Sequence, residues 1–294
     1  MQYQFLPNTP LEEADVVIVP FGLEKTVCAR GGTKDAPRAI LEASNQLEYF
    51  DELLEYSPMK YVNVHVTKEI QNKEDSEAIF KAVAQKQKLC ITLGGEHSIT
   101  PFVTQTLLKN KTTVVFLDAH ADLRSTYQGD RYSHATPAYH LLKQGHSLVM
   151  AGVRSLFEHE FQEVQNNDNI TFFGARELHK KTLRPLLECL EKLQGDVYLS
   201  IDMDVFDPSF VPSVGTPQPG GLGWYDALDI LEVLFRNKNI TLCGVDIVEL
   251  IPESSNVSQI FAAKLIQKII SLWVDAKGFR NQPPRGIQTK VEYE

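Results

Sequence analysis

The sequence has few cysteines, and they are widely spaced. Among 294 residues there are four, Cys28, Cys90, Cys189 and Cys243, and they form no CxxC pair. A zinc site built from thiolates or a disulfide-stapled secreted fold would need clustered or numerous cysteines, so the sequence argues against both. We expect four reduced thiols, three of them within apolar runs, in a cytoplasmic protein.

The sequence also lacks a long hydrophobic run and an excess of positive charge. No segment reaches the roughly 18–20 apolar residues that span a bilayer, and residues 1–10 show no basic stretch followed by an apolar one, so we expect neither a membrane partner nor a signal peptide. The 29 basic residues are outnumbered by 38 acidic ones, for a net charge of −9. This balance argues against a nucleic-acid partner and suits a small cationic substrate.

What the sequence does contain is a regular alternation of short apolar runs and amphipathic segments. Most of the runs are continuously apolar, as in strands covered on both faces of a parallel sheet. The expected strands are Val16–Val19, Tyr61–Val66, Leu89–Leu93, Thr113–Leu117, Leu148–Ala151, Ile170–Phe173, Val197–Ile201 and Leu242–Val248. The expected helices are Ala36–Phe50, Asp75–Gln87, Ser98–Leu108, Pro137–Lys143, Leu183–Leu193, Trp224–Phe235 and Val257–Val274.

This alternation predicts one doubly wound α/β domain with a mainly parallel sheet over residues 1–275. Residues 276–294 form a polar tail that contains Pro283-Pro284. We expect the tail either to fray or to pack on a neighbouring molecule.

Polar clusters follow four of the expected strands. The strand Leu89–Leu93 runs into Gly94-Gly95-Glu96-His97-Ser98, and Thr113–Leu117 runs into Asp118-Ala119-His120-Ala121-Asp122. The strand Val197–Ile201 runs into Asp202-Met203-Asp204-Val205-Phe206-Asp207-Pro208, and the last strand ends at Glu249. Because parallel sheets bind ligands beyond the carboxyl ends of their strands, we expect the functional site there.

The histidines and aspartates of these clusters form a candidate set of metal ligands: His97, Asp118, His120, Asp122, Asp202 and Asp204. In an extended strand Asp118 and Asp122 would stand about 13 Å apart, so the chain must curl after the strand to bind one ion with both. Asp202 and Asp204, about 6.6 Å apart, suit two ions separated by about 4 Å. An oxygen-rich set with imidazole and without thiolate favours Mn²⁺ over structural zinc.

Each motif alone is also common as a solvated turn, a loop histidine or a helix cap. Three clusters at the ends of strands of one sheet favour the metal site, because burying so many carboxylates without a counter-ion would be costly. Four aspartates balance two divalent ions, and Glu249 adds negative charge. Such a site should attract a cation and polarise water into a nucleophile.

Together these motifs resemble the ureohydrolase family, which includes arginase and agmatinase. The resemblance is carried by GGEHS at Gly94–Ser98, DAHAD at Asp118–Asp122, SIDMDVFDP at Ser200–Pro208 and GTPQPGGL at Gly215–Leu222. It implies a three-layer arginase/deacetylase-like fold with an eight-stranded sheet, two Mn²⁺ per chain and a homo-oligomer, a trimer or a hexamer. It also implies that a metal-bridging hydroxide attacks a guanidinium carbon to give urea and an amine.

The resemblance assigns roles to single residues as well. Asp118 and Asp202 would bridge the two ions, His97 and Asp122 would complete one coordination shell, and His120 and Asp204 the other. Glu249 matches the glutamate that binds the guanidinium group. His134, in Tyr132-Ser133-His134-Ala135-Thr136, is the candidate proton shuttle, because histidine titrates near neutral pH. With Asp122, these two residues form the predicted catalytic group; the alternatives for them are a surface acid and a loop histidine.

The predicted substrate is agmatine, hydrolysed to urea and putrescine, a polyamine. The segment Tyr127–His134 and the run Gly152-Val153-Arg154-Ser155 resemble agmatinases, and Asp130 would suit the substrate's amine end. Gln218 and Glu96 depart from the residues usual in agmatinases. The alternatives are arginase, guanidinobutyrase, guanidine hydrolase, formiminoglutamase, a zinc deacetylase of the same broad fold, or a catalytically inert family member.

Overall fold

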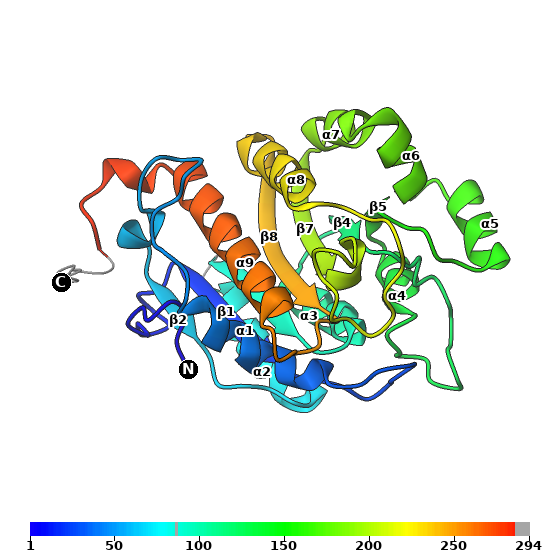
Figure 1. Ribbon diagram of the computed structural model, residues 1–294, viewed down its shortest axis with the longest axis horizontal. Helices are drawn as coiled ribbons and strands as arrows, with labels where there is room; N and C mark the ends of the chain where they lie inside the picture. The colour runs from blue at the N-terminus through cyan, green and yellow to red at the C-terminus, as the bar shows by residue number, and fades with distance from the viewer. Residues whose placement is uncertain (86–87, 286–294) are drawn as a thin grey trace.

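The computed structural model describes residues 1–85 and 88–285, and within them eight strands form one parallel sheet (Figure 1). The strands are β1 (Val16–Phe21), β2 (Val64–Val66), β3 (Leu89–Gly94), β4 (Thr113–Leu117), β5 (Ser147–Ala151), β6 (Ile170–Phe173), β7 (Gly195–Asp202) and β8 (Ile240–Val248). Their order is β2-β1-β3-β8-β7-β4-β5-β6, and every pairing is parallel.

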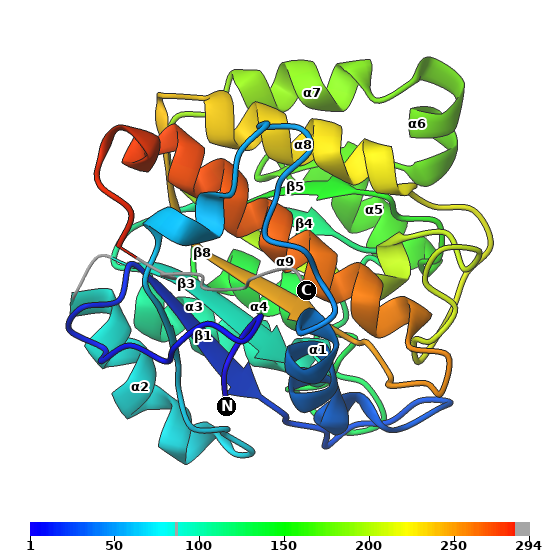
Figure 2. The same ribbon diagram turned by 60° about the vertical axis from the view of Figure 1, so that its left-hand side comes forward.

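Helices cover both faces of the sheet. On one face α1 (Ala36–Ser44), α9 (Val257–Ala276), α8 (Trp224–Arg236) and α7 (Arg184–Glu191) follow one another across the sheet (Figure 2), with α6 (Ala175–Lys181) beside α7. On the other face lie α2 (Lys73–Gln85), α3 (Thr100–Leu107), α4 (Pro137–Lys143) and α5 (Glu158–Asn166). Short 3-10 turns are η1 (Thr33–Asp35), η2 (Pro58–Tyr61), η3 (His97–Ile99), η4 (Met203–Val205) and η5 (Phe279–Asn281). The predicted doubly wound fold with an eight-stranded sheet is confirmed.

The continuous apolar runs have a direct structural reason. In β1, β3, β4 and β5, alternate residues enter the two hydrophobic clusters on opposite faces of the sheet. In β4, Val115 and Leu117 pack under α7–α9, whereas Val114 and Phe116 pack against the other helical layer. A strand covered on both faces has no solvent-facing side to be polar, and this removes the period-two pattern of half-exposed strands.

Some elements differ from the prediction. The first helix ends at Ser44 rather than Phe50, and α2 begins at Lys73, while residues 86–87 of its predicted end lie outside the described residues. The helices α5 and α6 were not predicted, because each buries few apolar residues; Phe161 of α5 is half exposed. Helix α9 is long and apolar enough to cross a membrane, but it packs against α1 and α8 and is mostly buried, as in a core helix.

The polar C-terminal tail is described only in part, because residues 286–294 lie outside the described residues. The part before them packs back on the domain. The backbone N–H of Arg285 donates to the carbonyl of Lys60 at 3.0 Å, and Nη1 of Arg285 lies 3.7 Å from Oδ1 of Asp15.

The strand order explains how four distant clusters form one site. The strands β3, β8, β7 and β4 are neighbours at the centre of the sheet. Their register aligns Leu93 with Ile247, Ile247 with Ile201, and Ile201 with Leu117. The polar residues that follow these four positions therefore emerge at one edge of the sheet, beyond its carboxyl end.

Candidate active site

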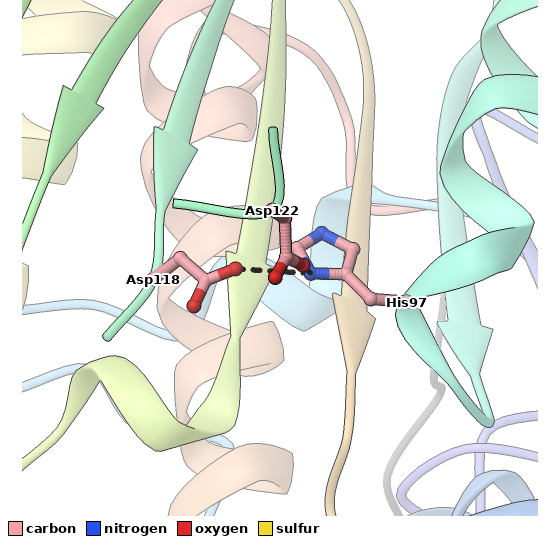
Figure 3. Close-up of side chains that lie close together, drawn as sticks. All are labelled: His97, Asp118 and Asp122. Carbon is pink, nitrogen blue, oxygen red and sulfur yellow. Dashed lines mark ion pairs between the residues drawn. The ribbon is translucent and has the colours of Figure 1, made fainter. Parts of the chain in front are cut away.

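The six predicted metal ligands are brought together at this edge, and His97 lies at the centre of one group. Its Nδ1 lies 3.1 Å from Asp118 Oδ2, 3.2 Å from Asp202 Oδ2 and 3.5 Å from Asp122 Oδ2. Figure 3 shows the carboxylates of Asp118 and Asp122 directed at the His97 ring from one side. The ligand atoms of His97, Asp118 and Asp122 all lie within 4.8 Å of one another, close enough to hold one metal ion.

A second group adjoins the first and shares Asp118 with it. His120 Nδ1 lies 2.9 Å from Asp204 Oδ2 and 3.7 Å from Asp118 Oδ1, and these three residues also fit one ion. Asp118 thus directs one oxygen to each group. Two adjacent groups that share a carboxylate match the arrangement of a binuclear centre.

The backbone makes the turn that the sequence demands after β4. Asp122 adopts a left-handed conformation with φ of 52°, which returns its side chain toward Asp118. The N–H of His120 donates to Asp118 Oδ1 at 2.6 Å, and the N–H of Ala119 donates to Asp204 Oδ1 at 3.1 Å. Glu249 is left-handed as well, with φ of 64°. Non-glycine residues in this conformation cost free energy and gather at functional sites.

A buried layer of hydrogen bonds fixes the orientation of His97. Its Nε2 lies 2.9 Å from Ser200 Oγ, and that hydroxyl donates to Asp246 Oδ1 at 2.7 Å. The other oxygen of Asp246 accepts from Tyr198 and Thr100. Because the Ser200 proton goes to Asp246, the Ser200 oxygen accepts from His97 Nε2–H, which leaves the Nδ1 lone pair for a metal.

Sequence reasoning gave Ser200 and Asp246 no role of their own. The signal for Asp246 was its position as the one acid within the mostly apolar strand β8. Asp246 is fully buried, and burial raises the pKa of its carboxyl group. Such a buried acid needs hydrogen-bonding partners, and one of them, Ser200, also contacts the candidate ligand His97.

The electrostatics of the cluster favour a divalent cation. Burial and the charges of Asp204 and Asp118 raise the pKa of Asp202 well above its usual value, and burial with the charge of Asp118 raises the pKa of Asp122 to about 7. For Asp118 burial also acts upward, but the nearby imidazoles of His120 and His97 outweigh it and lower the pKa to about 2. The carboxyl groups of Asp202 and Asp122 therefore hold protons unless positive charge replaces them.

Two buried atoms test whether these side chains fit a metal ion. Among the described residues, His97 Nδ1 and Asp118 Oδ2 are buried side-chain atoms without a hydrogen-bond partner. Both belong to the set predicted to bind metal, and both point into the same space. Buried polar atoms left in this way are costly unless a ligand engages them, so the donor set fits a metal ion.

Glu249 and His134 border a cavity of about 310 Å³ that opens onto the ligands His120, Asp202 and Asp204. Burial raises the pKa of Glu249 to about 8, and its Oε1 accepts from the N–H of His97 at 2.7 Å. Burial lowers the pKa of His134 below its usual value. The structure therefore places both predicted catalytic side chains beside the candidate metal centre.

Asp130 is not among the residues that line this cavity, and its carboxylate is paired. Its Oδ2 forms an ion pair with Lys25 Nζ at 2.8 Å, so its charge is engaged near the surface. A larger cavity of about 1060 Å³ lies between α6, α7 and residues 219–222. Within the described part of the chain, the lining of that larger cavity contains none of the six predicted ligands.

Comparisons with known proteins agree with this geometry. The model of the Arginase family matches residues 14–271. The chain is 36% identical to an N(1)-aminopropylagmatine ureohydrolase of Thermus thermophilus over 90% of this chain and 92% of the relative. It is 33% identical to an agmatinase of Pyrococcus horikoshii over 91% and 95%. The solved structure of an agmatine ureohydrolase of Thermoplasma volcanium superposes with a TM-score of 0.82 at 30% identity, covering 93% and 94% of the two chains.

Proposed function

The chain belongs to the arginase family, and from this premise we propose that it hydrolyses the guanidinium group of agmatine to urea and putrescine. The observation that carries the proposal is the meeting of six candidate metal ligands with Glu249 and His134 at one cavity. Every ligand of the predicted set is present, which favours an active hydrolase over an inert member. A zinc deacetylase, which needs a single ion, would not require a second group around His120.

We propose two Mn²⁺ ions per chain as the cofactors. His97, Asp118 and Asp122 would hold one ion, and Asp118, His120 and Asp204 the other, with Asp202 beside His97 as a further ligand. When bound, such a pair of ions supplies a hydrolytic nucleophile at neutral pH. The oxygen-rich donor set with two imidazoles suits Mn²⁺.

The protein's own side chains position the substrate and move the proton. Glu249 presents a carboxylate that accepts two parallel hydrogen bonds from a planar guanidinium group. Its raised pKa falls when a cation lies beside it, so substrate binding favours the charged form. His134 has a lowered pKa, so it is neutral at working pH. It takes up a proton from solvent in the cavity and delivers it to the departing amine nitrogen as the C–N bond breaks.

N(1)-aminopropylagmatine is the second candidate substrate. Three relatives with this activity in their names are 33% to 36% identical to the chain, whereas four relatives named agmatinase are 30% to 33% identical. Asp130, which the sequence analysis assigns to the amine end of agmatine, forms an ion pair with Lys25 instead, so this support for agmatine is weaker.

Urea release over a panel of guanidino compounds tests the proposal. The Mn²⁺-loaded protein would be assayed with agmatine, N(1)-aminopropylagmatine, arginine, 4-guanidinobutyrate and guanidine, and with formiminoglutamate by release of formamide. Highest kcat/KM for agmatine supports the proposal. Preference for aminopropylagmatine selects the second candidate, and faster turnover of arginine or of formiminoglutamate contradicts both.

We also propose that the protein works in the cytoplasm as a homo-oligomer, a trimer or a hexamer. The mass in solution, measured by light scattering, tests the assembly. A monomeric mass at micromolar concentration would contradict it.

A further inference from the structure

Glu96 is a buried acid that the proposed reaction does not use. Its side chain precedes the candidate ligand His97, and the residue is only 1% exposed. Its Oε2 accepts hydrogen bonds from the backbone N–H of Lys25 at 2.8 Å, the N–H of Thr26 at 2.5 Å and the hydroxyl of Thr26 at 3.0 Å. Its Oε1 accepts from the hydroxyl of Ser98. The carboxylate therefore anchors the loop that contains residues 25 and 26 to the end of β3.

Thr26 in turn holds His134. The ring Nδ1 of His134 lies 2.9 Å from the carbonyl oxygen of Thr26 and 3.0 Å from its hydroxyl. The backbone N–H of His134 also donates to the hydroxyl of Thr26, at 3.1 Å. Three segments that are far apart in the sequence thus meet in one connected set of hydrogen bonds, from Glu96 through Thr26 to His134.

The chemistry of these groups fixes the direction of every bond. A carboxylate that also receives two backbone N–H groups accepts, so the hydroxyl of Thr26 gives its single proton to Glu96. That hydroxyl is then an acceptor toward the N–H of His134. A carbonyl oxygen accepts as well, so both Thr26 groups near Nδ1 require Nδ1 to be the donor. The neutral ring must carry its proton on Nδ1, which leaves the lone pair on Nε2.

We propose that Glu96 and Thr26 are positioning residues that set the tautomer and the orientation of His134. They leave Nε2 as the basic nitrogen, on the side of the ring away from the loop. The inference rests on the proposed function for its kinetic consequence, but the position of the proton on the ring is independent of the substrate. A hydrogen bond to the second ring nitrogen commonly selects the tautomer of a functional histidine in this way.

Two substitutions break the connection at different points. Thr26→Val keeps the shape of the side chain and removes the hydroxyl, while the carbonyl of Thr26 still accepts from Nδ1. Glu96→Ala removes the acceptor and frees the Thr26 hydroxyl to donate to Nδ1, where it competes with the Thr26 carbonyl, so the proton shifts partly from Nδ1 toward Nε2. Thr26→Ser restores the hydroxyl. Thr106→Val is the matched control, because Thr106 is half-buried on α3 and bonds only to the carbonyl of Phe102 among the described contacts.

Steady-state kinetics of the Mn²⁺-loaded enzyme give the first readout. We expect Thr26→Val to lower kcat about five- to tenfold, the effect of one lost hydrogen bond, with KM changed less than about twofold. Thr26→Ser should recover most of the lost kcat, and the metal content of all variants should stay equal to that of the parent. Unchanged kcat in Thr26→Val, or a loss of kcat that follows a loss of metal, would overturn the proposal.

The second readout is the ¹⁵N spectrum of histidine-labelled protein by magic-angle-spinning NMR, with diamagnetic Zn²⁺ in place of Mn²⁺. The His134 signals are identified by their loss in His134→Asn. The proposal requires a protonated Nδ1 in the parent and a shift of the proton toward Nε2 in Glu96→Ala. A parent ring protonated on Nε2 would refute it, even if Glu96→Ala failed to fold. If no guanidino compound were hydrolysed, the proposed function would fail while this measurement still decided the tautomer.

Discussion

Nδ1 of His97 lies 3.1 Å from Oδ2 of Asp118, and among the described residues neither atom has a hydrogen-bond partner. The two atoms come from the ends of β3 and β4, which are separated in the sheet by β8 and β7. The fold therefore brings a nitrogen lone pair and a carboxylate oxygen together in a buried space. A divalent cation is the ligand that satisfies both.

The shared carboxylate of Asp118 predicts unequal effects of ligand substitutions. We expect Asp118→Ala to lose both ions, and Asp122→Ala to weaken chiefly the ion beside His97. Because the two ions act together on one substrate, both variants should lose urea release by at least about 10³-fold. Bound manganese per chain, measured by atomic emission after gel filtration, checks the difference. Asp168→Asn, on the exposed surface, is the control, and equal metal content in Asp118→Ala and the parent would contradict the prediction.

The buried acid behind His97 predicts a loss of metal affinity without a lost ligand. In Asp246→Asn the amide can donate to Ser200, so the Ser200 oxygen no longer reliably accepts from His97 Nε2. We expect manganese to bind about 10- to 100-fold more weakly, as measured by isothermal titration calorimetry. Tyr198→Phe removes one of the bonds to Asp246 and keeps the ring, so its effect should be smaller. Parent-like affinity in Asp246→Asn would show that this layer does not orient His97.

Some of the features behind these predictions could be found in the sequence, and others could not. The ligands could be predicted because each follows an apolar run in a short, unusual motif, and the continuous apolar pattern of β4 and β7 identified buried strands. The order of the strands could not be predicted, since pairing β8 between β3 and β7 is a tertiary choice that no local pattern encodes. Thr26 and Glu96 were missed for the same reason: their relation to His134 exists only when three loops meet. In the sequence alone, Thr26 is a residue of an ordinary loop, and Glu96 is the residue next to a candidate ligand.

The metal-free protein should be more stable at low pH than at high pH. Relative to the unfolded chain, the pKa of Asp122 is raised to about 7 and that of Glu249 to about 8. For an acid with a raised folded-state pKa, the folded form holds the proton more tightly, so this contribution to stability is present at acidic pH and is lost as the pH rises toward 8. Thermal unfolding of chelator-treated protein at pH 6 and pH 8.5 checks the sign.

Manganese should reverse that dependence, because ions replace the protons held by the cluster. We expect proton release on binding, seen as a binding enthalpy that varies with the ionisation enthalpy of the buffer. We also expect a larger rise in Tm on adding manganese at pH 8.5 than at pH 6. An equal rise at both values, with no proton release, would mean that the carboxylates are already charged without metal.

His134 predicts a defect in turnover rather than in binding. Replacing it by Asn removes the basic nitrogen and keeps a side chain of similar polarity, so we expect kcat to fall by about 10²-fold or more, the usual contribution of a general acid–base group. Because the pKa of His134 is lowered, the parent should lose activity only below its ordinary pH range near 6.5, and the variant should lack that acidic limb. His179→Asn, an exposed histidine, is the control. A raised KM with normal kcat would instead assign His134 to substrate binding.

The position of Arg124 suggests that it selects substrates by the charge at the end opposite the guanidinium group, here called the tail. It lines the cavity, and its guanidinium carbon lies 4.7 Å from the ring centroid of Tyr127 and 4.2 Å from that of Phe157. Its Nε also lies 3.9 Å from Oε2 of Glu160, which offsets part of its charge. The remaining positive charge repels a positively charged tail and attracts a negatively charged one. In Arg124→Gln we therefore expect KM for agmatine to fall by about two- to fivefold, the size of effect expected for charges near a protein surface. The fall should be larger for N(1)-aminopropylagmatine, because this substrate carries one more positive charge.

The same substitution should raise KM for 4-guanidinobutyrate, whose tail is a carboxylate. Opposite signs for the two kinds of substrate distinguish an electrostatic effect from a general loss of packing, which would change KM in one direction for both. Arg176→Gln is the matched control, since Arg176 lines the separate cavity beside α6 and lies outside the lining of the candidate site. If KM rose for every substrate in Arg124→Gln, the stacked guanidinium would be supporting the Tyr127 and Phe157 rings rather than selecting the charge of the tail.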